Sequence, residues 1–194
     1  MTARLPASER REQLFAVALE AFAARGFHAT SMSDIADAAG VTKPVLYQHF
    51  TSKHELYREL LEDVGDRLMS GMWSAFTGAE TAREQVEAGL VAYFRFVQHD
   101  HHAFALLFSA NVRRDDEFSE TVKRCEDAIA SMIAPLITAD IDESHRLLLA
   151  YSLVGMAETA SRRLVANKLE FEPTVVARQL ADLAWAGLRG IHRV

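Results

Sequence analysis

The chain has 194 residues, of which 49% are hydrophobic and 25% are charged, with nine glycines and four prolines. This composition is that of a globular protein and excludes long disordered, collagen-like or fibrous segments. A chain of this length buries about 70% of the surface that it exposes when unfolded, so it forms a sizeable core without disulfides or metals. The single cysteine, Cys125, excludes an intramolecular disulfide.

The most apolar segment also argues against a membrane-spanning protein. Residues 147–157 form it, and they are far fewer than the roughly 18 that a span requires. Residues 1–11 contain no apolar run of the kind found in signal peptides. We therefore expect a cytoplasmic protein with no membrane partner.

Charge is distributed unevenly along the chain. The net charge is -6, which over the whole chain argues against a nucleic-acid binder. Residues 1–53, however, carry six basic and five acidic side chains, a net of +1, which leaves -7 for the rest. We therefore expect any polyanion to meet the N-terminal end of the chain.

Helical spacing recurs throughout, and no segment alternates apolar and polar residues for long enough to predict a strand. We therefore expect an all-α protein. The first helix is predicted after Pro6, with Ser8 as its N-cap, and it ends at Gly26. Its core-facing side chains recur three and four positions apart: Phe15, Ala18, Leu19 and Phe22.

Two short helices are predicted next. Ser31 and Asp34 have the spacing of a capping box, which starts the first of them. Pro44 suits the first turn of the second, because the fixed φ of proline fits a helix and its missing N–H would be unpaired there. Leu46 and Phe50, four positions apart, share the inner face of this helix.

Longer helices fill the rest of the chain. One begins after Thr51 and Ser52, and others are predicted near residues 86–97, 104–108 and 118–136. Residues 147–157 are apolar on almost all sides, and a final helix follows Pro173.

The last two helices carry more apolar face than one monomer needs to cover, which favours a dimeric four-helix bundle. The alternative is that the apolar helix lies in the core of the monomer. The predicted dimer contacts are Leu153, Val176, Leu180, Leu183, Ala184, Gly187 and Leu188.

The two short helices, joined through residues 40–42, form a candidate helix-turn-helix, whose second helix would enter the major groove of DNA. On its outer face, Gln48 can pair with adenine and Lys43 with guanine or a phosphate, and Val45 can touch a thymine methyl group. The alternative is an ordinary helix pair with a solvated face. The predicted DNA contacts are Thr30, Ser33, Thr42, Lys43, Pro44, Val45, Tyr47, Gln48, His49 and Lys53.

The residues themselves favour DNA binding. Residues 30–56, TSMSDIADAAGVTKPVLYQHFTSKHEL, resemble the DNA-binding signature of TetR-family transcriptional regulators. The resemblance implies that residues 42–49 contain the recognition helix, and that Tyr47, His49 and Lys53 meet the DNA backbone. It also implies a homodimer whose C-terminal domain binds a ligand and dimerises through the last two helices. Many members of the family carry a small residue where this chain has Pro44. A proline cannot donate a backbone N–H to a phosphate.

The expected organisation has two domains. Residues 1–53 form an N-terminal arm and a three-helix helix-turn-helix DNA-binding domain, and residues 54–194 form a helical ligand-binding and dimerisation domain. The arm would bring Arg4, Arg10 and Arg11 to DNA. We expect a ligand-responsive transcriptional regulator, in the family's usual arrangement a repressor, that binds a palindromic operator as a homodimer. The alternative is a helical ligand-binding protein without sequence-specific DNA binding.

Shorter blocks resemble actinobacterial TetR-type regulators of fatty acid synthesis that respond to long-chain acyl-CoA: FVQHD at 96–100, LVGM at 153–156 and WAGL at 185–188. This resemblance implies a small hydrophobic effector, with long-chain acyl-CoA as the candidate. Methionine and aromatic side chains adapt to such chains, although they also simply fill cores. The predicted cavity lining is Met69, Met72, Trp73, Phe94, Phe104, Phe108 and Phe118.

No motif predicts catalysis, since the chain has no Gly-rich phosphate loop, nucleophile elbow or HExxH sequence. The run from His99 to His102 contains residue types that bind zinc or nickel. No second cluster supports it, so a polar helix junction is favoured over a metal site. We therefore expect no enzyme, no catalytic residue, no metal and no cofactor.

Overall fold

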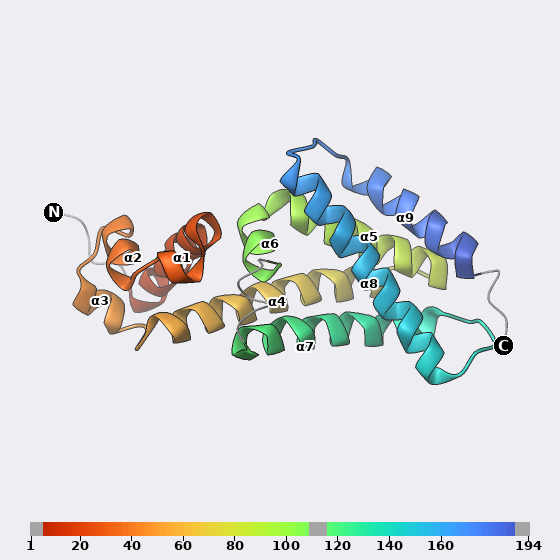
Figure 1. The fold of residues 1–194 in the computed structure, drawn as a ribbon, viewed down its shortest axis with the longest axis horizontal. Helices are drawn as coiled ribbons and strands as arrows, with labels where there is room; N and C mark the ends of the chain where they lie inside the picture. The colour runs from red at the N-terminus through yellow and green to blue at the C-terminus, as the bar shows by residue number, and fades with distance from the viewer. Residues whose placement is uncertain (1–5, 109–115, 189–194) are drawn as a thin grey trace. The chain divides into compact units, whose positions relative to one another are not determined.

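The computed structural model describes residues 6–108 and 116–188, and all regular structure in these ranges is helical, which confirms the all-α prediction (Figure 1). In the same ranges, no helix is long and apolar enough to cross a bilayer. The helices are α1 (Ala7–Ala29), α2 (Met32–Ala38), α3 (Lys43–Tyr47), α4 (Lys53–Thr77), α5 (Ala82–His99), α6 (His101–Leu107), α7 (Asp116–Ile133), the 3-10 turn η2 (Ala134–Leu136), α8 (Glu143–Ala166) and α9 (Pro173–Leu188).

The described chain divides into two compact units. The N-terminal unit contains residues 6–65, 102–108 and 116–122, and the C-terminal unit contains residues 66–101 and 123–188. Helices α4 and α7 therefore contribute to both units. The predicted domain division after residue 53 falls at the start of α4 and stays a prediction.

Helix α1 starts earlier than predicted and is broken near its end. Pro6 is its N-cap, so Ser8 lies inside the helix and the prediction of Ser8 as the cap was wrong. Gly26 has a φ of 78°, a left-handed conformation that glycine adopts without strain, and the chain resumes a helical path to Ala29. Ala18 and Phe22 of the predicted stripe are buried, whereas Phe15 and Leu19 are half-buried and Leu14 lies in the core in their place.

The start of α2 is held by the predicted capping box. The backbone N–H of Asp34 donates to the Ser31 hydroxyl at 3.2 Å, and the backbone N–H of Ser31 donates to the Asp34 carboxylate at 2.8 Å. These bonds satisfy two of the N–H groups that a helix start leaves without partners. Hydrogen bonds from the Ser31 hydroxyl and backbone also hold the pKa of Asp34 below its ordinary value.

The turn between α2 and α3 depends on Gly40, which has a φ of 65°. Its N–H donates to the carbonyl of Asp37 at 3.1 Å, and the N–H of Val41 donates to the carbonyl of Ala36 at 2.9 Å. These two bonds form a Schellman motif, which ends α2 and directs the chain into α3. A residue with a Cβ would be strained at this φ.

Aromatic side chains form much of the core of the N-terminal unit. The ring of Phe27 lies 4.9 Å from that of Tyr57 and 5.0 Å from that of Phe118, measured between centroids. The His54 ring stacks on Phe118 at 4.5 Å. The beginning of α7 therefore packs against α1 and α4 within this unit.

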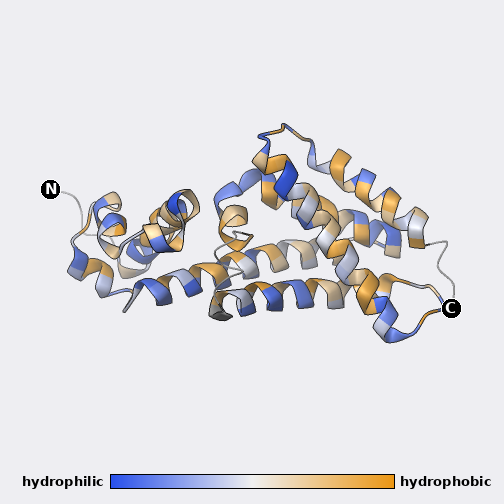
Figure 2. Ribbon diagram, in the orientation of Figure 1, coloured by the Kyte–Doolittle hydropathy of each residue, from blue (hydrophilic) through white to orange (hydrophobic). Residues whose placement is uncertain are grey.

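In the C-terminal unit, α9 lies beside α5, and α8 contacts both helices (Figure 1). Hydrophobic residues recur along α9 (Figure 2). Between α5 and α9, the exposed Arg83 and Asp182 pair at 2.5 Å, and the exposed Arg178 pairs with the half-buried Glu87 at 3.3 Å. Burial of the apolar faces supplies most of the stabilisation, because exposed ion pairs are each worth less than about 1 kcal/mol.

Candidate functional site

The helix-turn-helix presents one face of α3 to the solvent. Its inner side chains, Leu46 and Phe50, are both 0% exposed, so this short helix is fixed to the core of its unit. The exposed members of the predicted DNA-binding set are Thr42, Lys43, Pro44, Tyr47 and Gln48. The half-buried members are Ser33, Val45, His49 and Lys53. The structure thus places nine of the ten predicted contacts at least partly within reach of solvent.

Thr30 is the exception in this set. Its side chain is 1% exposed, and its hydroxyl lies 2.8 Å from the carbonyl oxygen of Gly26, to which it donates. The hydroxyl is thus used to close the broken end of α1, and its side chain cannot reach DNA in this conformation. The expectation of a side-chain contact from Thr30 is therefore corrected.

Arg11, on α1, supports the residues that follow α3. One guanidinium nitrogen donates to the carbonyl of His49 at 3.2 Å, and another pairs with the carboxylate of Glu59 on α4. The guanidinium carbon also lies 4.5 Å from the centroid of the Phe50 ring, a cation–π contact. The expectation that Arg10 and Arg11 belong to a basic arm was wrong, because both lie in α1. Arg4 lies outside the described residues.

Lys53 has a structural contact that sequence reasoning missed. Its ammonium group donates to the carbonyl of Phe27 at 2.8 Å and lies 4.3 Å from the centroid of that ring. The contact ties the start of α4 to the end of α1. An ammonium group has three N–H donors, so this bond does not prevent a second one to a phosphate.

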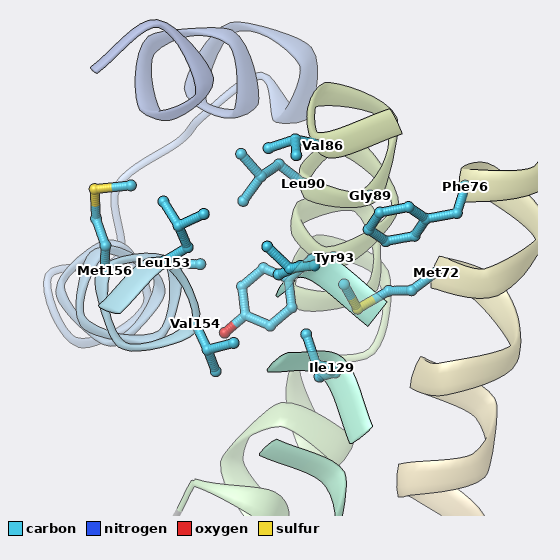
Figure 3. Close-up of a pocket in the computed structure, with 12 residues that line it drawn as sticks. Met72, Phe76, Val86, Gly89, Leu90, Tyr93, Ile129, Leu153, Val154 and Met156 are labelled. Atoms are coloured by element: carbon cyan, nitrogen blue, oxygen red, sulfur yellow. The ribbon is translucent and has the colours of Figure 1, made fainter. Parts of the chain in front are cut away.

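The C-terminal unit contains a cavity between α4, α5, α7 and α8, shown in Figure 3. Its free volume is about 30 Å³, enough for two or three water molecules at about 10–15 Å³ each. It is lined by Met72, Phe76, Val86, Gly89, Leu90, Tyr93, Ile129, Ile133, Leu153, Val154, Met156 and Ala157.

Only Met72 of the seven predicted ligand-binding residues lines this cavity. Phe118 belongs to the core of the N-terminal unit, and Trp73 is 59% exposed on α4. The other members lie elsewhere in the two units: Met69, Phe94, Phe104 and Phe108. The predicted lining was chosen by residue type and contains only Met and aromatic side chains, whereas the observed lining is mostly aliphatic.

The predicted dimer residues divide by exposure. Leu183 is 62% exposed, Ala184 is buried, and Leu153 lines the cavity. The remaining members are exposed or half-buried: Val176, Leu180, Gly187 and Leu188. Sequence analysis missed three exposed apolar side chains on α8 and α9: Leu148, Tyr151 and Val175.

The polar junction between α5 and α6 is held by local contacts. Asp100 accepts a hydrogen bond from Arg67 at 2.7 Å, and Nδ1 of His99 lies 2.8 Å from the carbonyl oxygen of Arg95. In the described part of the chain, no three His, Cys, Asp or Glu side chains are grouped as metal ligands.

A helix-turn-helix with an exposed second helix, in a chain whose second unit is also entirely helical, defines a DNA-binding protein of the helix-turn-helix class. The family model for "Bacterial regulatory proteins, tetR family" matches residues 14–60, and that for "Tetracyclin repressor-like, C-terminal domain" matches residues 82–187. The chain belongs to the TetR family, and it is a transcriptional regulator rather than an enzyme.

Known proteins agree with this assignment. The HTH-type transcriptional activator FasR of Mycolicibacterium smegmatis is 36% identical over 187 residues, which cover 95% of this chain and 85% of FasR. A TetR-like transcriptional regulator from Rhodococcus sp. RHA1 has a TM-score of 0.84 and 30% identity, covering 97% of this chain and 100% of that one. FadR of Bacillus subtilis, solved with stearoyl-CoA, is similar in fold, with a TM-score of 0.77 at 18% identity over 93% of this chain and 99% of FadR.

Proposed function

We propose that two copies of this chain bind a palindromic operator and insert their α3 helices into successive major grooves, about one helical turn apart. The exposed outer face of α3 on a fully buried inner face is the observation that carries the proposal. Gln48 and Val45 read base edges, whereas Lys43, Tyr47, His49 and Lys53 meet phosphates. Thr42 and Ser33 lie at the helix starts, where hydroxyl groups reach the DNA backbone.

The dimer forms through the exposed apolar surface of α8 and α9. Leu148 and Leu183 are each 62% exposed, and such side chains are stabilised when a partner covers them. A Cβ added to Gly155 or Gly187 would meet no atom within 4 Å, so at these positions the surface is open to close approach. A second copy is the expected partner, because two-fold homodimers are the commonest oligomers.

The effector is a small hydrophobic molecule that binds in the cavity of the C-terminal unit. The cavity is small in this conformation, so ligand entry requires side chains such as Phe76 to move. By linkage, the effector lowers DNA affinity only as far as it prefers the conformation that does not bind DNA. Long-chain acyl-CoA is the candidate that the short sequence blocks support, and the fold is shared with a FadR protein solved with stearoyl-CoA.

Release of repression by the effector is the regulatory outcome that we propose. Activation is the second candidate, because the relative FasR is a transcriptional activator. A helical ligand-binding protein that no longer reads DNA is the alternative that the near-neutral charge of residues 1–53 favours.

The test is a fluorescence anisotropy titration with DNA from the protein's own upstream intergenic region and with a scrambled duplex, repeated across salt concentrations. We expect a preference on the order of 10³ or more for the native duplex, with a steep salt dependence. Stearoyl-CoA should then weaken specific binding. Equal, weak affinity for both duplexes would favour the alternative, a helical ligand-binding protein without sequence-specific DNA binding.

Gln48→Ala sharpens this test. Loss of one base-reading side chain should reduce discrimination at one operator position by about 1–3 kcal/mol, with little change in affinity for scrambled DNA. Affinities for a set of single-base operator variants measure this effect. A uniform loss across all duplexes would assign Gln48 to the DNA backbone instead.

A further inference from the structure

Helix α3 is too short to hold its own orientation. It has five residues, Lys43–Tyr47, and an isolated helix of this length is not stable in water. Residues 48–52, which we call the α3–α4 corner, follow it before α4 begins at Lys53 (Figure 1). In the proposed complex, His49 in this corner and Lys53 next to it meet phosphates. The conformation of the corner therefore decides whether these contacts form together.

The corner is held from two sides. The N–H groups of His49 and Phe50 donate back to the carbonyl of Leu46 at 3.0 and 3.1 Å. The carbonyl of His49 accepts a hydrogen bond from the guanidinium of Arg11 at 3.2 Å. The same guanidinium lies 4.5 Å from the centroid of the fully buried Phe50 ring. Arg11 thus contacts both the backbone and a core side chain of the corner from α1.

Arg11 is itself oriented by Glu59 on α4. The two side chains form an ion pair and are 41% and 25% exposed, respectively. A guanidinium is a planar fork with five N–H donors, so it binds a carboxylate and a carbonyl at once, which the ammonium group of lysine does less well. The carboxylate of Glu59 also balances the positive charge. The arrangement suits a support for the corner better than a contact to phosphate.

We propose that Arg11 is a positioning residue of the DNA interface, which holds the α3–α4 corner in its DNA-binding conformation and so favours the operator over other DNA. The inference rests on the proposed function in that the corner contacts the operator. Non-specific binding depends mainly on charge, whereas specific binding requires contacts in one register. A corner that is ordered before binding spares an ordering cost, which changes affinity by roughly 3- to 10-fold.

Arg11→Gln and Arg10→Gln form a matched pair for the test. Arg10 is the next residue on α1, is also half-buried, and donates to Gln13 on its own helix at 2.7 Å. Each substitution removes one positive charge. Dissociation constants are measured for the native upstream duplex and the scrambled duplex. Relative to Arg10→Gln, we expect Arg11→Gln to weaken native-duplex binding by roughly 3- to 10-fold and to leave scrambled-duplex binding within about 2-fold. Arg11→Lys should fall between Arg11→Gln and the wild type.

Glu59→Ala separates positioning from charge. This substitution removes a negative charge, so electrostatics alone would tighten binding to both duplexes. Positioning predicts the opposite sign for the native duplex, because Arg11 loses the carboxylate that orients it. We expect Glu59→Ala to weaken native-duplex binding by roughly 3- to 10-fold, with scrambled-duplex binding unchanged or tighter. Tighter binding to both duplexes would mean that Glu59 only withholds Arg11 from a phosphate, and it would overturn the inference.

Amide hydrogen exchange tests the corner without DNA. Exchange of the N–H groups of His49 and Phe50 should be faster in Arg11→Gln than in the wild type and unchanged in Arg10→Gln. Thermal melts check that each variant is folded at the temperature of the titrations. Partial unfolding lowers affinity for both duplexes in the same proportion, so it leaves the ratio of the two affinities unchanged.

Two results overturn the inference. One is that Arg11→Gln changes the ratio of the two affinities no more than Arg10→Gln does, which leaves the proposed function intact. The other is that the wild type itself shows no preference for the native duplex, which contradicts the proposed function as well. An equal loss of affinity for both duplexes, with a smaller salt dependence, would make Arg11 a direct phosphate contact and not a positioning residue.

Discussion

The DNA-reading surface and the cavity are built in different ways. The surface comes from one continuous segment, residues 30–53, whose caps and turn are made by near neighbours in the sequence. The cavity lining comes from four helices spread between Met72 and Ala157. Local chemistry therefore shapes the first region, whereas packing between distant helices shapes the second.

This difference decides how each region responds to substitution. In the helix-turn-helix, exposed side chains are free to change because the fold depends on a few buried ones such as Leu46. In the cavity, the Phe76 ring packs so close to Gly89 that a Cβ at this position would lie 2.7 Å from the ring. The position of the ring therefore depends on residue 89 having no side chain. The fold of the helix-turn-helix thus tolerates substitution on its exposed face, whereas the packing of the cavity does not tolerate a larger residue at position 89.

The largest expected effect is that of Leu46→Ala. Removal of this fully buried side chain should lower the free energy of unfolding by about 2–5 kcal/mol and abolish specific DNA binding. Urea denaturation followed by circular dichroism measures the loss. Gln48→Ala, exposed on the same element, is the control and should stay within about 0.5 kcal/mol of the wild type. A stable Leu46→Ala variant would mean that α3 is not held by its inner face.

A glycine pair tests the cavity. Gly71→Ala on α4 meets no atom within 4 Å and should raise stability by up to about 1 kcal/mol through helix propensity. Gly89→Ala has the same gain but forces the Phe76 ring to move, at a cost of about 1–3 kcal/mol. The difference between the two unfolding free energies is the measurement. In a Phe76→Leu background, the difference in unfolding free energy between Gly71→Ala and Gly89→Ala should be smaller. Equal unfolding free energies of the two variants in the wild-type background would show that the Phe76 ring moves freely.

The capping box tests the local character of the helix-turn-helix. Ser31→Ala should lower the free energy of unfolding by about 1 kcal/mol. Because the pKa of Asp34 is depressed in the folded state, its stabilisation is present above the ordinary value of 3.8 and is lost as pH falls through the lower folded pKa. In Ser31→Ala, NMR titration should find the Asp34 pKa closer to 3.8. An unchanged pKa would contradict the role of the hydroxyl.

The two lysines of the surface should show the smallest effects. Lys43→Ala should reduce the salt dependence of DNA binding by about one phosphate contact without a change in stability, because its side chain is exposed. Lys53→Ala should lower affinity and also stability, by about 1 kcal/mol, because its ammonium group binds the Phe27 carbonyl. Anisotropy titrations across salt and thermal melts separate these effects. An unchanged salt dependence in Lys53→Ala would leave Lys53 a purely structural role.

Much of the helix-turn-helix could be predicted because its signals are local. The Ser31 and Asp34 pair lies three residues apart, and Gly40 marks a turn that only a residue tolerant of positive φ completes easily. Arg11 could not be placed in the same way. Its partners, His49 and Glu59, are 38 and 48 residues away, so nothing near Arg11 distinguishes a support for α3 from a basic arm.

The amino-acid sequence by itself determined the all-α class, the helix-turn-helix and the family, because helical periodicity, caps and a long motif are properties of neighbouring residues. Only the tertiary structure decided which apolar side chains line the cavity and that the ring of Tyr93 is buried among them. Periodicity shows that a side chain faces the core, but not which side chain from another helix it meets. Phe118 and Tyr93 both face inward on amphipathic helices, and only packing sends one to an aromatic core and the other to the cavity.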